Sequence, residues 1–109
     1  MVAFISIFSL RQGCDPEEAD NYWREKHTVW AKSIMLPELK KYTRYRVMQS
    51  WGNVDVFGMV KLLFEDLESA RRAVGRLVAA PPDKFLSEYI TNVRRMMVKE
   101  EEVELPAIK

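Results

Sequence analysis

The fold is decided by the stretch VAFISIF at residues 2–8, near the start of a chain of 109 residues. Its β-branched and aromatic residues are typical of a β-strand. Both alternating sets of side chains are apolar, and Ser6 is the exception. A strand that is apolar on both faces needs cover on both faces of its sheet. The stretch therefore predicts a sheet that is buried on its two sides.

A long amphipathic helix is predicted after this strand. Asp15 suits the N-cap, Pro16 suits the first helical position, and Glu18 completes a capping box. We expect the helix to end near Met35, because the residue before Pro37 avoids the helical region. Its apolar stripe consists of Ala19, Trp23, His27, Trp30 and Ile34.

The rest of the chain predicts three more strands and two more helical segments. The strands are expected at residues 40–51, 55–64 and 93–103. Asp66 is the expected cap of a second helix that ends before Pro81, and residues 83–90 indicate a short third helix. The apolar stripe of the second helix consists of Leu67, Ala70, Val74, Leu77 and Val78. This order of elements predicts one α+β domain over residues 1–109, a ferredoxin-like βαββαβ fold with a four-stranded antiparallel sheet.

Two helices can cover only one face of such a sheet. The segments at residues 2–8 and 55–64 are apolar on both faces, apart from Ser6 and Lys61. An uncovered apolar face of that size is an aggregation liability. A second copy of the chain is the economical cover, so we expect a face-to-face homodimer. The alternative is a monomer whose second face is partly exposed.

Composition argues against several classes of function. Lys and Arg number 17 and Asp and Glu number 16, so the net charge of +1 gives no reason to expect a nucleic-acid partner. Cys14 and His27 are single residues of their types, which argues against an internal disulfide and a two-histidine metal site. No apolar run approaches the roughly 18 residues of a membrane span, and no signal peptide is recognised. We expect a cytoplasmic protein with no metal and no membrane partner.

His27 is the first candidate for chemistry. An unperturbed imidazole titrates near neutrality, so His27 could act as a general acid or base. Trp23 and Trp30 lie one turn to either side and would suit a flat, unsaturated ligand. The alternative is a core histidine that is hydrogen-bonded to a backbone carbonyl, with the two tryptophans as ordinary core residues.

A second group of candidates lies on the strand after Pro37. Alternation places Tyr42, Arg44 and Arg46 on one face and Tyr45 on the other. A tyrosine that faces the helix could hydrogen-bond a carbonyl or a phenol, and an arginine could hold a carboxylate. The alternative is a charge pattern that is solvated or lies at a subunit interface.

Two segments carry a family resemblance. YWREKH at residues 22–27, followed by LPELKKY at residues 36–42, resembles the EthD domain family of the dimeric α+β barrel superfamily. The resemblance extends through FGMV at residues 57–60 and FED at residues 64–66. It implies a ferredoxin-like protomer, a homodimer closed into a barrel by two sheets, and a pocket between sheet and helices. His27 and Tyr42 match the recurrent polar groups of that pocket.

The resemblance implies a cofactor-independent enzyme of the dehydratase, cyclase, decarboxylase or isomerase type. Its substrate would be an aromatic, polyketide-like or lactone small molecule. His27 would move a proton, and Tyr42 would hydrogen-bond the developing enolate oxygen. The expected substrate-binding residues, which would form the walls of the pocket, are Trp23, Trp30, Tyr45 and Tyr22. The chain departs from related catalysts in having no second histidine.

Two alternatives come from other classes of function. One is a cofactor-free monooxygenase or a haem-handling barrel of the same superfamily, although Ser6 stands where haem-degrading relatives have an asparagine. The other is a non-catalytic small-molecule-binding or stress protein. A ligand that co-purifies and leaves unchanged would favour binding over turnover.

Overall fold

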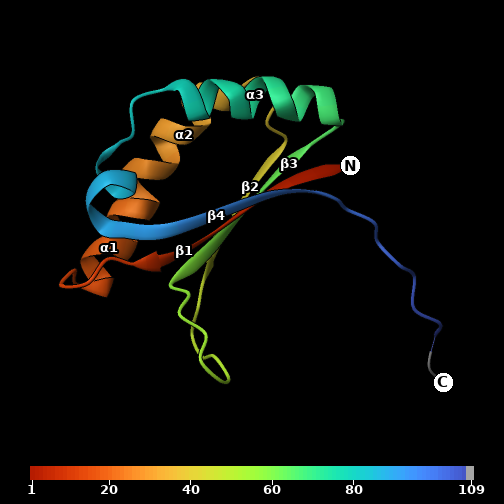
Figure 1. The fold of residues 1–109 in the computed structure, drawn as a ribbon. Coiled ribbons are helices and arrows are strands. Elements are labelled where there is room, and N and C mark those ends of the chain that lie inside the picture. Colours follow the sequence, from red (N-terminus) through yellow and green to blue (C-terminus); the bar gives the residue numbers. More distant parts are fainter. Residues whose placement is uncertain (108–109) are drawn as a thin grey trace.

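One four-stranded antiparallel sheet organises the computed structural model, which describes residues 1–107 (Figure 1). Its strands are β1 (Val2–Leu10), β2 (Lys41–Arg46), β3 (Gly58–Phe64) and β4 (Ile90–Lys99). The spatial order is β2-β3-β1-β4, so the stretch at residues 2–8 lies inside the sheet and pairs on both sides. The predicted ferredoxin-like α+β fold is confirmed.

The first helical segment begins where the capping box predicts. It consists of α1 (Pro16–Tyr22), the π-helical turn η1 (Trp23–His27) and α2 (Thr28–Met35), which follow one another without a break. Asp15 Oδ2 accepts a hydrogen bond from the backbone N–H of Glu18 at 2.9 Å. This bond satisfies one of the amides that are left free at a helix start.

The π turn changes which residues of this segment are buried. A π turn takes up one residue more than an α turn, so the apolar stripe changes phase after Trp23. Ala31 and Met35 are buried, whereas the predicted stripe residues Trp30 and Ile34 are half-buried. The prediction of one uninterrupted stripe is therefore wrong beyond the turn. Trp30 is left at the edge of the core rather than inside it.

The second helix is α3 (Leu67–Ala79), and it is followed by a second π-helical turn, η2 (Phe85–Tyr89). Asp66 Oδ1 caps α3 through the backbone N–H of Ser69 at 2.8 Å, as predicted. The small residues Ala70 and Ala73 are fully buried and allow α3 to approach the sheet. The ends of the predicted stripe, Leu67 and Val78, are exposed.

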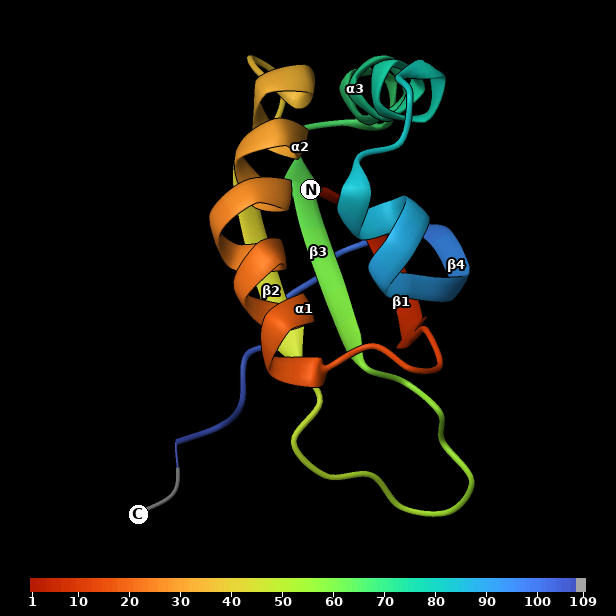
Figure 2. The same cartoon turned by 90° about the vertical axis from the view of Figure 1, so that its left-hand side faces the viewer.

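All helices lie on one face of the sheet (Figures 1 and 2). On this covered face, β1 and β3 contribute Phe4, Phe8, Leu62 and Phe64, which are buried with Trp23 in one core. The neighbouring residues of each strand point to the opposite, open face, because side chains alternate along a strand. There the small residue Ala3 is buried, but the larger apolar residues are only half-buried or exposed. They are Ile5, Ile7, Tyr45, Met59, Leu63, Met96 and Val98.

The strands predicted at residues 40–51 and 55–64 are shorter in the structure, because the first ends early and the second begins late. β2 ends at Arg46, and the loop that follows extends away from the helices before β3 begins (Figure 1). Met48, Trp51 and Val54 are exposed in this loop. The last strand is shifted relative to its prediction at 93–103, since β4 begins at Ile90 and ends at Lys99. Glu100 still bonds to the backbone of Met1 and to Lys61, and the chain beyond it leaves the sheet as an extended tail.

An ion-pair clamp joins the end of α2 to α3. Arg76 donates to Glu38 Oε1 at 2.6 Å and to its Oε2 at 3.1 Å, and a further bond to the backbone oxygen of Ile34 measures 2.9 Å. Arg72 adds a longer bond of 3.4 Å to Glu38. The hydrogen bonds from Arg76 lower the pKa of Glu38 to about 2. This clamp holds the two helices in place above the sheet.

Candidate functional site

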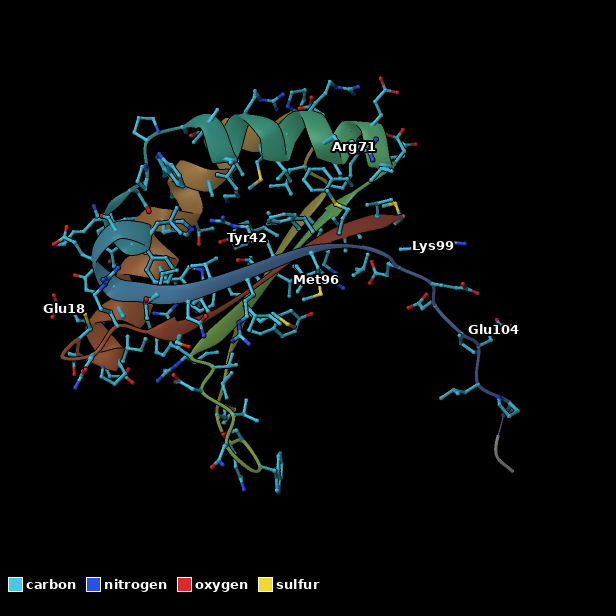
Figure 3. All side chains as sticks on the ribbon, in the orientation of Figure 1. Glu18, Tyr42, Arg71, Met96, Lys99 and Glu104 are labelled. Carbon is cyan, nitrogen blue, oxygen red and sulfur yellow. The ribbon has the colours of Figure 1, made fainter. Side chains whose placement is uncertain are left out.

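A small cavity lies between the helices and the covered face of the sheet, where the family resemblance predicts a pocket. Its volume is about 40 Å³, which is room for one or two water molecules. Aromatic and aliphatic side chains form most of its lining. The side chains with hydroxyl or charged groups in that lining are Ser6, His27, Tyr42 and Arg95. Figure 3 shows Tyr42 between the helices and the sheet, with Met96 on the other side.

His27 ends the π turn η1 and borders this cavity with 8% of its surface exposed. Its Nδ1 lies 2.7 Å from Oδ2 of Asp83. The side chain of Asp83 is itself only 9% exposed, and its Oδ1 accepts a bond from the backbone N–H of Leu86 at 3.1 Å. One buried carboxylate therefore holds the imidazole and the start of η2 together.

Two aromatic rings pack close to the imidazole. The ring centroid of Phe85 lies 4.7 Å from that of His27, and the centroid of Trp30 lies 5.4 Å away. Phe85 in turn stacks on Trp23 at 5.5 Å. These contacts fix the plane of the imidazole, while the bond to Asp83 fixes its rotation in that plane.

Two buried polar groups at the cavity have no protein partner within residues 1–107. They are the hydroxyl of Ser6 and the Nε2 of His27, on residues that are 6% and 8% exposed. In this part of the chain, Arg46 Nε is the one fully buried side-chain nitrogen or oxygen without a hydrogen bond. Because Ser6 Oγ and His27 Nε2 lack a partner and are not among the fully buried atoms, solvent must reach both of them. The cavity is the space that both residues line.

Tyr42 reaches the cavity from β2. Its hydroxyl oxygen accepts a hydrogen bond from Trp23 Nε1 at 3.3 Å, and the hydroxyl of Thr28 is its second polar neighbour. Burial raises the pKa of Tyr42, so the phenol stays protonated through the neutral range. The side chain is thus a neutral hydroxyl in the lining of the cavity that His27 also borders.

The arginines of β2, which were candidates for binding a carboxylate, contact other side chains of the protein. Arg44 donates to Asp20 at 2.8 Å and stacks over the Trp23 ring at 4.5 Å. Arg46 stacks over Phe57 at 4.4 Å. Both arginines support the wall behind Trp23 and do not line the cavity.

Two predicted wall residues lie elsewhere. Tyr22 packs on Tyr89, with ring centroids 5.3 Å apart, and does not line the cavity. Tyr45 lies on the open face, because its neighbour Tyr42 three residues earlier faces the helices. There it borders a shallow groove with Ile7 and Met59. Of the four predicted wall residues, Trp23 and Trp30 line this cavity and Tyr22 and Tyr45 do not, and their roles in binding a substrate stay predictions.

Asp83 and Phe85 were not singled out from the sequence. Asp83 is 56 residues from His27, so no local spacing connects the two. The available signal was the position of Asp83 after Pro81 and Pro82, which is typical of a helix cap. This signal predicts a helix cap at Asp83, but it does not connect Asp83 with His27.

Residues 1–107 show neither a cluster of metal-binding side chains nor a membrane-spanning helix. These residues contain no group of three or more histidine, cysteine or carboxylate side chains that could hold a metal ion. None of their helices combines the length and the apolar character that crossing a membrane requires.

Comparison with known proteins identifies the family. The family model of the EthD domain matches residues 11–84, which include η1, Tyr42 and Asp83. The chain belongs to the EthD domain family. The resemblance seen in its two sequence segments is therefore confirmed. No curated protein matches the chain in sequence.

Solved structures share the fold of this EthD domain. An ethyl tert-butyl ether d (EthD) family protein from Bacillus halodurans is 22% identical, with a TM-score of 0.69 over 93% of this chain and 99% of that one. A dimeric ferredoxin-like protein of unknown function from Bacteroides fragilis is 15% identical, with a TM-score of 0.62 over 91% and 95%. SnoaB from Streptomyces nogalater, a cofactor-independent oxygenase, is 17% identical, with a TM-score of 0.61 over 94% of each chain.

Proposed function

We propose that this EthD domain is a cofactor-independent enzyme that moves a proton on a flat phenolic or enolic molecule. The observation that carries the proposal is the 2.7 Å bond between His27 and Asp83 at the edge of an aromatic cavity. A base that is oriented by a buried carboxylate is the arrangement of many acid–base enzymes. An ordinary core histidine would have both ring nitrogens hydrogen-bonded, whereas Nε2 has no partner within residues 1–107.

The contact with Asp83 sets the direction of proton transfer. The carboxylate oxygen accepts, so Nδ1 carries the hydrogen and the lone pair lies on Nε2. Nε2 takes a proton from a phenol, an enol or a carbon next to a carbonyl. The imidazolium that forms is stabilised by Asp83, and it returns the proton in a later step.

Tyr42 supplies the matching stabilisation of negative charge. When a proton leaves a carbon next to a carbonyl, charge develops on the carbonyl oxygen. A hydroxyl that donates a hydrogen bond to this oxygen lowers the barrier. Tyr42 is suited to this role because its oxygen is already held by Trp23 and burial raises its pKa.

A ring enters this site only if side chains at its edge move. The cavity of about 40 Å³ is smaller than a benzene ring requires. Trp30, Leu77 and Leu86 line it and are half-buried, whereas most of the other apolar side chains in the lining are buried. We expect these three side chains to shift when a ligand binds. The proposed substrate is an aromatic, polyketide-like or lactone small molecule whose reacting part is planar.

The test is catalysed hydrogen–deuterium exchange. Cyclic 1,3-diketones and β-keto lactones are incubated in D₂O with the protein, and loss of the acidic C–H signal is followed by NMR. We expect the protein to accelerate exchange and His27→Gln to abolish the acceleration. Asp83→Asn should slow it by about 100-fold or more, because the amide favours the wrong tautomer.

Folding of the variants is checked by the backbone NMR spectrum, and Cys14→Ser serves as a control because Cys14 does not line the cavity. Full exchange by His27→Gln would overturn the proposed base. Absence of exchange combined with tight, unchanging binding would favour a binding protein.

The similarity to SnoaB makes cofactor-independent oxygenation the second candidate. That chemistry also needs a base that deprotonates a phenol, so the same His27 would serve. The two candidates differ in their use of dioxygen. Turnover that continues anaerobically supports isomerisation, cyclisation or lyase chemistry, and stoichiometric oxygen consumption supports oxygenation.

We also propose that the open face of the sheet is covered by a second copy of the chain. Its exposed apolar side chains include Met96 and Tyr45, which are 43% and 39% exposed. The related Bacteroides fragilis protein is described as dimeric. Sedimentation equilibrium should give a mass near twice 12.8 kDa. A monomer at micromolar concentration would contradict this assembly.

A further inference from the structure

The lining of the cavity includes one charged side chain, Arg95, that forms no ion pair within residues 1–107. Arg95 lines it from β4 and is exposed. Within residues 1–107, Arg95 has no carboxylate within ion-pair distance. By contrast, Arg44 binds Asp20 and Arg76 binds Glu38. A guanidinium that borders a binding cavity without a partner is available to a ligand.

The sheet register places Arg95 next to a second unpartnered group. Arg95 on β4 pairs with Ser6 on β1, so both side chains stand on the covered face. Cross-strand neighbours of this kind are about 5 Å apart at Cβ. The hydroxyl of Ser6 is reached by solvent although the residue is only 6% exposed. A cation and a hydroxyl therefore lie side by side in the lining of the cavity.

From this pairing we propose that the ligand carries a carboxylate, held by Arg95 with Ser6, on a ring whose hydroxyl or enol group faces His27. The inference rests on the proposed function and narrows its substrate class to hydroxylated aromatic or enolic acids. An arginine binds a carboxylate through two parallel hydrogen bonds, which neutral groups cannot match. Ser6 then donates a third bond to the same group.

The test compares two probes of the same shape, 3-hydroxybenzoate and 3-hydroxybenzamide. His27 is the single histidine of the chain, so its ring signals report binding without assignment. We expect the benzoate to bind about tenfold more tightly than the benzamide, since a hydrogen bond to a charged group outweighs a neutral one. Arg95→Gln should reduce this ratio to near one, and Arg95→Lys should retain part of it because the charge remains.

The neighbouring arginine provides a matched control. Arg94 is also on β4 but pairs with Ile7 and so stands on the open face. Arg94→Gln removes the same charge and should leave the ratio unchanged. If Arg94→Gln lowers the ratio as much as Arg95→Gln does, the preference arises from net charge and the inference is wrong.

The remaining outcomes separate this inference from the proposed function. If the benzamide shifts the His27 signals and the benzoate binds no better, the cavity binds rings but Arg95 holds no carboxylate. If neither probe shifts the signals, the cavity is not a ligand site, and the proposed function fails together with the inference.

Discussion

The two faces of the sheet carry similar amounts of apolar side chain but lie in different surroundings. On the covered face, Phe8 and Phe64 are at most 3% exposed beneath helices of the same chain. On the open face, Ile5 and Met59 are only half-buried, and no element within residues 1–107 lies over them. The same strands supply both sets. The comparison shows that alternation along a strand predicts where side chains point, whereas burial depends on what packs against them.

The largest expected effect is a loss of stability when a side chain of the covered face is truncated. Trp23→Ala removes a fully buried ring that packs on Phe8 and Phe85. We expect the free energy of unfolding to fall by about 3–5 kcal/mol. Met96→Ala on the open face should cost less than about 1 kcal/mol when the chain is monomeric. Urea unfolding of both variants measures the difference, and equal losses would show that the faces are equally packed.

The second prediction places a charge on the open face. Met96→Lys should raise the dissociation constant of the proposed dimer by about 100-fold or more, because two like charges would meet across it. Val78→Lys is the control, since Val78 is an exposed apolar residue on the outer side of α3. Sedimentation of both variants gives the comparison. Loss of the dimer in both, or in neither, would argue against the open face as the interface.

The third prediction compares two tyrosines of β2 that face opposite ways. Tyr42→Phe removes the buried hydroxyl near His27 and should slow catalysed exchange by about tenfold, the effect of one hydrogen bond to a developing oxyanion. Tyr45→Phe removes a hydroxyl from the open face and should leave the rate unchanged. The measurement is the exchange assay with saturating diketone. A slower rate in Tyr45→Phe alone would place the site on the open face.

The smallest effect concerns the clamp that holds the covering helices. The pKa of Glu38 is lowered to about 2 in the folded protein, from 4.5 for an ordinary glutamate. Its ion pair therefore contributes stability above pH 4.5 that is lost as the pH falls toward 2. Glu38→Gln should flatten the loss of stability in this range and leave the dimer intact. Thermal unfolding between pH 5 and pH 2.5 tests it, and an unchanged profile would contradict the pKa shift.

Local signals predict the fold well, and the resemblance to the EthD domain family agrees with it. The caps at Asp15 and Asp66 begin both helices where predicted, because a capping side chain bonds to an amide three residues away. The ends of β2 and β4 are less well predicted. A strand ends where its partner ends, and Trp51 leaves the sheet because no neighbouring strand extends beside it.

The site is predicted only in part. His27, Trp23, Trp30 and Tyr42 line one cavity as expected. Asp83 comes to His27 through the packing of η2 on η1, which no spacing in the sequence reveals. Tyr45 was assigned to the walls even though strand alternation already placed it opposite Tyr42.

The carboxylate of Asp83 has a consequence for the dynamics of the molecule. Its two oxygens serve two tasks, because one binds His27 and the other caps the turn η2 at Leu86. Any local opening of residues 83–89 therefore releases the imidazole at the same moment. The fraction of molecules ready for the proposed proton transfer would then be limited by a local unfolding equilibrium rather than by global stability. The rate of hydrogen exchange at the Leu86 amide would report the fraction of molecules in which Asp83 holds the imidazole.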